Sequence, residues 1–143
     1  MNDVKNFILD KAKERFDRFG YKKMTMDELS RDCGISKKTI YWHFYNKEDL
    51  FTELMLRESF KVRQILLDGI AEASDPLEKL IQLIKDAIAI FSEDSFLTRL
   101  FKADEILFSP FISRKYDYVI RAEINSIVSA IICEEKSRGS FVK

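Results

Sequence analysis

GISKKTIYWHFYNKEDL, residues 34–50, gathers three lysines, two tyrosines, a tryptophan and the only histidine of the chain. No acidic residue stands between Asp32 and Glu48, although the whole chain balances 24 basic against 24 acidic residues. Such a local excess of positive charge and hydrogen-bond donors suits a surface that meets phosphates and base edges. The residues on either side indicate how the chain would present that surface.

Two short capped helices are predicted on either side of a glycine turn. Thr25 can cap a helix that ends at Gly34, and Ser36 can cap the helix that follows, KKTIYWHF. Ile40 and Phe44 are four residues apart and can pack against the first of these helices. This arrangement predicts a helix-turn-helix, whose second helix lies in the major groove of DNA in the standard docking.

The exposed face of that second helix is expected to carry the DNA contacts. Lys37, Lys38 and Tyr41 are neighbours on it and can reach base edges or phosphates. A solvated helix start is the alternative for the two lysines, but the helix dipole disfavours positive charge there. Core packing is the expectation for Phe44 and Tyr45. Phosphate contacts are expected from the flanking donors Trp42, His43 and Lys47.

The rest of the chain is also predicted to be helical. With 4 glycines and 2 prolines in 143 residues, few turns are expected, and apolar residues recur at helical spacing. Asn46 can cap the fourth helix, which is long enough to leave one domain and enter another. The expected fold class is therefore all-α. The predicted helices cover about residues 4–19, 26–33, 37–44, 47–69, 77–91, 97–107 and 111–136.

A sequence signature, Y-x-H-F-x-x-K-x-x-L, follows Gly34 and Ser36 at fixed spacing. Its members here are Tyr41, His43, Phe44, Lys47 and Leu50. Through this signature, residues 8–50 resemble the amino-terminal DNA-binding domain of the tetracycline-repressor-like (TetR/AcrR) transcriptional regulators. The match has no gaps and covers about a third of the chain.

The resemblance implies a three-helix helix-turn-helix DNA-binding domain, residues 1–46, and a helical effector-binding and dimerisation domain, residues 47–143. Lys37, Lys38 and Tyr41 fall where such regulators touch base edges. Lysine at 38 departs from the glycine or proline often found there, which leaves the operator sequence open. The positions where the family touches phosphates are Thr25, Thr39, Trp42, His43 and Lys47.

The second half resembles no specific family and is expected to bind a small-molecule effector, largely apolar, between its helices. Its aromatic residues at helical spacing are more typical of simple core packing, which stays the alternative. An effector that favours one tilt of the fourth helix would change the spacing of two recognition helices in a homodimer. The candidate pocket residues are Phe60, Phe91, Phe101, Phe108, Tyr116 and Ile120.

The carboxyl end departs from the resemblance. Family members usually continue after a segment such as EEKSRGSFVK with two helices that form the dimer interface. The helical domain is therefore expected to be truncated, with its carboxyl-terminal helices missing. The last predicted helix should expose an apolar patch that favours association. This patch consists of Ile124, Ile127, Val128, Ile131 and Ile132.

The expected function is a transcriptional repressor that leaves an inverted-repeat operator on double-stranded DNA when its effector binds. The alternative is a DNA-bound interaction protein of the same fold with no small-molecule effector. An enzyme is not expected, because the chain has one histidine, no Gly-rich phosphate loop and no recognisable nucleophile with its base. For the same reasons neither a metal site nor a cofactor is expected.

The cellular location is expected to be the cytoplasm. Cys33 and Cys133 stand in apolar segments and are predicted to be small buried hydrophobes, unpaired in a reducing compartment. No apolar run approaches the ~20 residues needed to cross a membrane, and the amino end shows no signal-peptide pattern. A membrane partner is therefore not expected.

Overall fold

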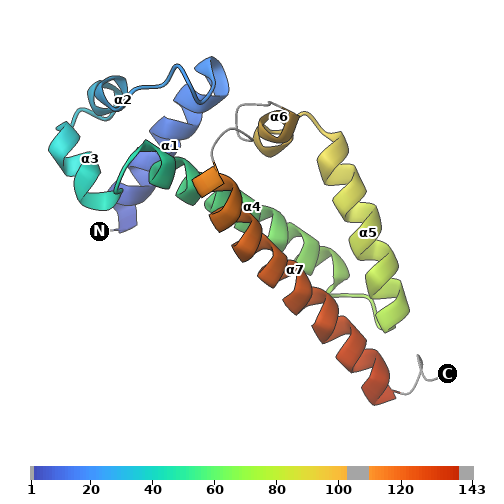
Figure 1. The fold of residues 1–143 in the computed structure, drawn as a ribbon. Helices are drawn as coiled ribbons and strands as arrows, with labels where there is room; N and C mark the ends of the chain where they lie inside the picture. The colour runs from blue at the N-terminus through green and yellow to red at the C-terminus, as the bar shows by residue number, and fades with distance from the viewer. Residues whose placement is uncertain (1, 103–109, 139–143) are drawn as a thin grey trace.

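The computed structural model describes residues 2–102 and 110–138, with side chains placed for residues 3–99 and 114–134. Within these ranges the chain forms helices joined by turns and contains no strand, so the predicted all-α class is confirmed. The helices are α1 (Asn2–Phe19), α2 (Met26–Cys33), α3 (Lys37–His43), α4 (Lys47–Ile70), α5 (Pro76–Ser92), α6 (Phe96–Lys102) and α7 (Pro110–Arg138). Figure 1 shows α1 to α3 gathered around the start of α4, while α7 runs beside α4 and α5 lies along its far half.

Short polar residues begin three of the helices at the predicted places. The side-chain oxygens of Thr25, Ser36 and Asn46 each accept a hydrogen bond from the backbone N–H three residues later, at 3.2, 3.1 and 2.7 Å. Each bond satisfies an N–H that has no partner within its helix. Gly34 ends α2 in the left-handed region at φ 67°, where other residues are strained. These local signals confirm the predicted boundaries of the helix-turn-helix.

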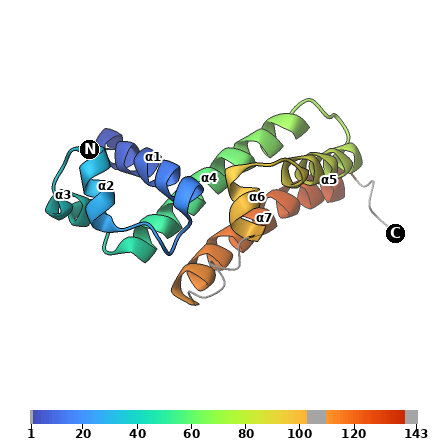
Figure 2. The same cartoon turned by 90° about the horizontal axis from the view of Figure 1, so that it is seen from above.

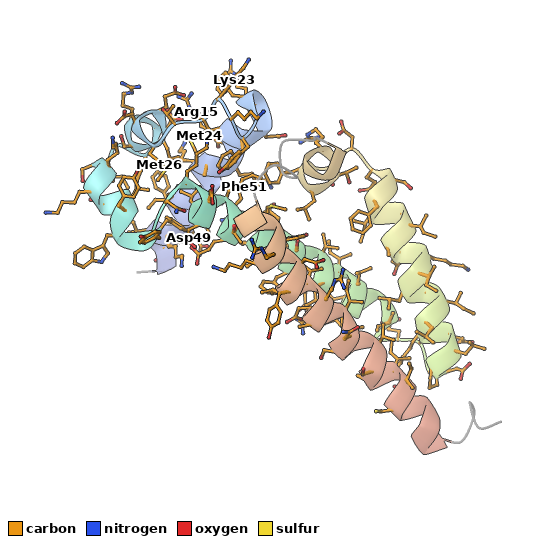
Figure 3. All side chains as sticks on the ribbon, viewed as in Figure 1. Arg15, Lys23, Met24, Met26, Asp49 and Phe51 are labelled. Carbon is orange, nitrogen blue, oxygen red and sulfur yellow. The ribbon has the colours of Figure 1, made fainter. Side chains whose placement is uncertain are left out.

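The amino-terminal unit, formed by α1, α2, α3 and the first turns of α4, contains a dense core. Phe51 of α4 meets Phe16 of α1 edge to face, with ring centroids 4.7 Å apart, and Tyr21 lies 4.8 Å from Phe51. Figure 3 shows Met24 and Phe51 inside this unit. The largest fully buried side chains of the described residues all belong to it: Phe16, Phe44, Phe51, Ile8, Met24, Leu29, Ile40, Leu50, Leu54 and Met55.

Arginine contacts orient α2 on α1. From α1, Arg15 donates to Asp32 at 2.8 Å and to Glu28 at 3.1 Å, and both carboxylates belong to α2. The hydrogen bond between Arg15 and Asp32 raises the pKa of the guanidinium and lowers that of the carboxyl. The paired charges hold the first helix of the helix-turn-helix against the core.

The carboxyl half, formed by the rest of α4 with α5, α6 and α7, is more open. Figure 2 shows α5 and the end of α7 away from the amino-terminal unit. By contrast, α6 lies beside that unit, where Arg99 donates to Asp17 of α1 at 2.8 Å. Ile84 and Ile88 of α5 are 57% and 63% exposed, and Ile124 of α7 is 54% exposed. The apolar surface predicted on the last helix is thus present at Ile124, whereas Ile131 is buried. Apolar surface of this kind is available to a ligand or a partner.

Candidate nucleic-acid interface and ligand groove

The apolar side of α3 is buried, and its polar side faces solvent. Ile40 is 0% exposed and Phe44 is 1% exposed, because both pack into the core of the amino-terminal unit. Lys37, Lys38 and Tyr41 are exposed on the other side of α3, and we call these three the recognition face. The structure therefore brings the three predicted base-contact residues together on one accessible surface. That they touch DNA bases stays a prediction.

Within the recognition face, Lys37 is held by an acidic residue of α2. Its ammonium lies 2.9 Å from the carboxylate of Asp27. This hydrogen bond raises the pKa of Lys37 and lowers that of Asp27. Both side chains are largely exposed, and exposed ion pairs contribute little to stability. Lys37 can therefore exchange Asp27 for a DNA acceptor with little loss.

Two predicted phosphate-contact residues, Thr25 and Thr39, lie at helix starts beside the recognition face. Thr25 accepts the capping hydrogen bond at the start of α2, and its hydroxyl hydrogen can still be donated. Thr39 shares a hydroxyl contact of 2.9 Å with Ser36 at the start of α3. Helix starts also favour anions through their unpaired N–H groups. Both threonines are thus placed where a phosphate can be bound.

The other three residues predicted to contact phosphates differ in their exposure and in their contacts within the protein. Trp42 is 82% exposed and presents its indole N–H to solvent, while His43 is half-buried. The ammonium of Lys47 lies 4.3 Å from the ring centroid of Tyr21, a cation–π contact that fixes its direction. Burial raises the pKa of Tyr21 to about 12, so its hydroxyl stays neutral beside Lys47. Contact of these residues with phosphate stays a prediction.

Tyr45 was expected in the core, and this prediction is wrong. Its side chain is 86% exposed, while its backbone N–H donates to the Asp49 carboxylate at 3.0 Å. Tyr45 stands between the end of α3 and the cap of α4, outside the apolar stripe that carries Ile40 and Phe44. That off-stripe position is the sequence signal for its exposure. With Trp42, Tyr45 gives the end of α3 an exposed aromatic surface.

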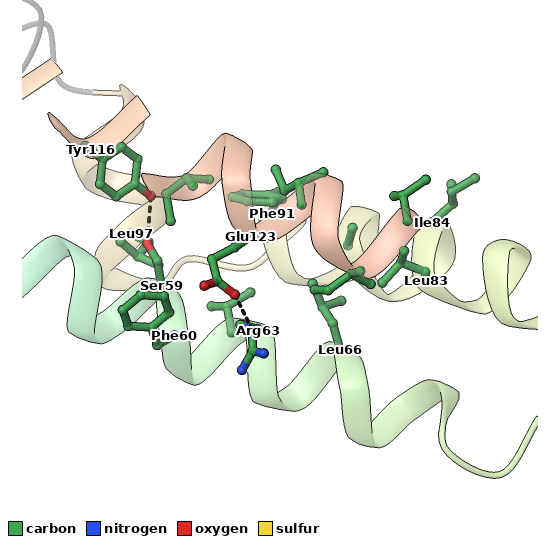
Figure 4. A pocket seen from close by; sticks show the side chains of 16 residues that line it. Ser59, Phe60, Arg63, Leu66, Leu83, Ile84, Phe91, Leu97, Tyr116 and Glu123 are labelled. Carbon is green, nitrogen blue, oxygen red and sulfur yellow. Dashed lines mark hydrogen bonds and ion pairs between the residues drawn. The ribbon is translucent and has the colours of Figure 1, made fainter. Parts of the chain in front are cut away.

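A groove of about 290 Å³ lies in the carboxyl half, with side chains of α4, α5 and α7 around it (Figure 4). Its volume is near the lower end of typical ligand sites. Four of the predicted pocket residues, Phe60, Phe91, Tyr116 and Ile120, line it. Phe108 and the side chain of Phe101 lie outside the described residues. The lining residues are Ser59, Phe60, Val62, Arg63, Leu66, Leu83, Ile84, Ala87, Phe91, Leu97, Tyr116, Ile120, Glu123, Ile124, Ile127 and Val128.

Two polar contacts cross this groove from α4 to α7. The hydroxyls of Ser59 and Tyr116 are 2.7 Å apart. Burial raises the pKa of Tyr116, and the hydrogen bond from Ser59 partly offsets that effect. Arg63 lies beside the Glu123 carboxylate as an ion pair, which Figure 4 marks. The four residues repeat at helical spacing along the groove-lining sides of α4 and α7. The pocket residues predicted from the sequence were five aromatic residues and Ile120, so only Tyr116 of these four was predicted.

Within the described ranges, no three His, Cys, Asp or Glu side chains are grouped as a metal site. None of the helices in those ranges is both long and apolar enough to cross a membrane. Cys33 is buried as predicted, and burial raises the pKa of its thiol. The prediction for Cys133 is wrong: it is exposed, because it stands two residues beyond buried Ile131 on α7 and faces the other side.

Comparison of sequences gives a family for the helix-turn-helix. Residues 8–54 match the model of the bacterial regulatory proteins of the tetR family. The HTH-type transcriptional regulator YhgD of Bacillus subtilis (strain 168) is 35% identical over 96 residues, which cover 67% of this chain and 50% of that protein. The chain spans about half the length of the curated relatives it matches.

Solved structures extend the likeness over both halves. A TetR-family transcriptional regulator from Mesorhizobium loti MAFF303099 is 26% identical with a TM-score of 0.75, over 96% of this chain and 70% of that one. FadR from Bacillus subtilis, solved in complex with stearoyl-CoA, is 21% identical with a TM-score of 0.73 and has the same fold over 96% of this chain and 73% of its own. By its helix-turn-helix and by this shared fold, the chain belongs to the TetR family of bacterial regulatory proteins.

Proposed function

We propose that this chain is a DNA-binding transcriptional regulator, a cytoplasmic repressor that leaves its operator when a largely apolar ligand occupies the groove. The observation that carries the proposal is that one helix serves both sites. The first turns of α4, including Leu50 and Leu54, are buried in the core that supports α3. Ser59, Arg63 and Leu66, farther along α4, line the groove. A ligand that moves α4 would therefore also move the recognition face.

In this proposal the recognition face reads DNA, and its neighbours hold the backbone. Lys37, Lys38 and Tyr41 are assigned to base edges in the major groove. Thr25, Thr39, Trp42, His43 and Lys47 are assigned to phosphates. Support comes from the exposure of α3 and from the family of residues 8–54. The division into residues 1–46 and 47–143 is proposed on the same support. By this division α4 belongs to the second part, although its first turns pack into the core of the first.

For the ligand, we assign the class of acyl compounds: an aliphatic chain with a carboxyl-derived head group. Most lining residues are aliphatic or aromatic, which suits a hydrocarbon chain. Hydroxyl and charged groups of Ser59, Tyr116, Arg63 and Glu123 offer a few polar contacts to a head group. FadR of the same fold was solved with stearoyl-CoA, a compound of this class.

A homodimer would let two recognition faces read an inverted repeat. Half-sites are then spaced by about 34 to 36 Å or a multiple of it. The exposed apolar residues of α5 and α7 give the carboxyl half a surface on which a second copy can pack. Ile88 and Ile124 are exposed members of this surface.

The test is selection of binding sites from a randomised duplex pool by the purified chain, followed by fluorescence anisotropy on the enriched duplex at two salt concentrations. An inverted repeat with a steep salt dependence supports the proposal. Titration of dodecanoyl compounds into the complex should then lower the anisotropy. If a duplex is enriched but no acyl compound weakens its binding, the ligand class is contradicted. That outcome favours the DNA-bound interaction protein. No enrichment would contradict sequence-specific regulation by this chain.

A further inference from the structure

The two polar contacts in the groove both join α4 to α7. Ser59 and Arg63 are four residues apart on α4, and Tyr116 and Glu123 are seven apart on α7, so each pair of residues lies on one side of its helix. Ser59 meets Tyr116 near the amino-terminal unit, and Arg63 meets Glu123 one turn farther along α4. A ligand that occupies this part of the groove lies against these contacts (Figure 4).

The ion pair is the less complete of the two contacts. Arg63 Nε lies close to the Glu123 carboxylate, yet its N–H is not directed at an oxygen, and the nitrogen is buried without a hydrogen bond. The two side chains are 41% and 33% exposed, so a ligand can reach both. A guanidinium fork favours two parallel hydrogen bonds to one carboxylate. Glu123 leaves that arrangement unmade, which favours its replacement by a better-placed carboxylate.

The charged and the aliphatic residues that line the groove lie in different parts of it. Among the described lining residues, Arg63 and Glu123 carry the only charges. Beyond them, toward the far end of α4, the wall consists of aliphatic side chains: Leu66, Leu83, Ile84, Ile127 and Val128. In Figure 4 the charged pair lies between Tyr116 at one end and Leu83 and Ile84 at the other. A molecule with one negative head and one aliphatic chain matches this order of groups.

Resting on the proposed function, we propose that the groove binds an ionised long-chain carboxylic acid whose carboxylate replaces Glu123 on the Arg63 guanidinium. The aliphatic chain lies toward Leu66 and Val128. No covalent bond changes; one carboxylate is exchanged for another. Glu123 moves into solvent, and the ionic link between α4 and α7 is lost. The acid thus acts by opening a contact that the free protein makes.

The experiment measures direct binding by calorimetry on the full 143-residue chain, with three probes of equal chain length: dodecanoate, dodecanol and dodecanoyl-CoA. We expect dodecanoate to bind about tenfold more tightly than dodecanol, because a charged hydrogen-bonded pair adds about 1.4 kcal/mol or more. Arg63→Gln should remove that difference, and Arg63→Lys should restore part of it. Glu123→Gln should tighten dodecanoate binding about threefold, since it removes the competing carboxylate.

Arg121→Gln is the matched control, because Arg121 is a well-exposed arginine of α7 that does not line the groove. It should leave all three affinities unchanged. Circular dichroism melts of each variant show whether the fold is kept. A Glu123→Gln variant that melts like the wild type and binds dodecanoate more weakly overturns the exchange.

Other outcomes separate the inference from the proposed function. Equal binding of dodecanoate and dodecanol by the wild type overturns the role of Arg63 but keeps the acyl class. Binding of dodecanoyl-CoA alone also keeps the class, and it overturns the free carboxylate as the bound head. If none of the three probes binds, both the carboxylate exchange and the acyl ligand are overturned.

Discussion

The apolar side chains at the two ends of α4, including those of the helices beside it, differ in their exposure to solvent. At one end, Leu50 and Phe51 are 0% exposed and complete a core shared with α1, α2 and α3. At the other, Ile84 of α5 and Ile124 of α7 are more than half exposed and line an open groove. A dense core fixes the geometry that DNA recognition requires, because close-packed interiors resist small shifts. An open apolar surface instead leaves room for a ligand or a second chain.

The largest effect should follow from removing an aromatic ring of the dense end. Phe51→Ala should lower the free energy of unfolding by about 3–5 kcal/mol, since the ring is 0% exposed and contacts Phe16 and Tyr21. Urea denaturation followed by circular dichroism measures it. Ile88→Ala is the control on the open end and should change stability by less than about 0.5 kcal/mol. Similar losses of stability in both variants would contradict the difference in packing between the two ends.

The buried carboxylate of Glu58 allows a test of how much the ion pairs between α1 and α4 contribute to stability. Glu58 is 7% exposed and bonds to Lys13 at 2.6 Å and to Lys61 at 2.9 Å. Burial alone would raise its pKa, but the two lysines outweigh burial and lower it. Glu58→Gln should therefore cost about 1–3 kcal/mol near neutral pH. Glu14→Gln, at an exposed carboxylate of α1, should cost almost nothing.

The same residue predicts a pH dependence. The folded-state pKa of Glu58 lies below its ordinary value of 4.5, so its stabilisation is fully present above about pH 4.5. It is lost as the pH falls through the lowered pKa. The stability difference between wild type and Glu58→Gln should shrink in that acid range, as measured by urea denaturation at stepped pH. A constant difference down to pH 2 would contradict the assigned shift.

Substitutions of the proposed DNA contacts on α3 and at the start of α4 should change DNA binding and leave stability unchanged. Lys37→Ala and Tyr41→Ala should each weaken the selected duplex about tenfold and random DNA much less. Lys47→Ala should weaken both DNAs equally and reduce the salt slope by ~1. Lys85→Ala, on α5, is the control. Fluorescence anisotropy at several salt concentrations measures these affinities. Equal losses of affinity for both DNAs in every variant would contradict the assignment of Lys37 and Tyr41 to base contacts.

The smallest effect concerns the carboxylate that holds Lys37. Asp27→Asn removes the partner at 2.9 Å and leaves Lys37 free to meet DNA. We expect the affinity for the selected duplex to rise roughly twofold, because exposed ion pairs are weak. Anisotropy with matched duplexes measures the change. A loss of affinity in Asp27→Asn would mean that Asp27 orients Lys37 for binding and does not merely compete for it.

The sequence predicts well what is decided locally. The caps at Thr25, Ser36 and Asn46 each depend on one side chain and the N–H three residues later, so they follow from the sequence alone. The turn at Gly34 and the exposed side of α3 follow in the same way. The errors fall at Tyr45 and Cys133, which both lie off the buried stripe of their segments. Helical spacing from Ile40 and Phe44, or from Ile131, indicates that exposure, but the prediction relied on residue type.

Contacts between distant helices were not predictable. The pairing of Arg63 with Glu123, and of Ser59 with Tyr116, depends on the register in which α7 lies along α4. Hydrophobic periodicity gives the side of a helix that is buried, but not its position along a neighbour. Polar residues of a groove are therefore found only once the fold is assembled.

The continuity of α4 sets the scale of motion that a ligand must cause. The helix contains no proline, and its only glycine, Gly69, stands at its far end, so it has no internal hinge. Its 24 residues extend about 36 Å at 1.5 Å per residue. A rigid rod of that length, turned by about 5° about one end, carries the other end by roughly 3 Å. That displacement is about one hydrogen-bond length, which is enough to break a hydrogen bond between a side chain and a base edge.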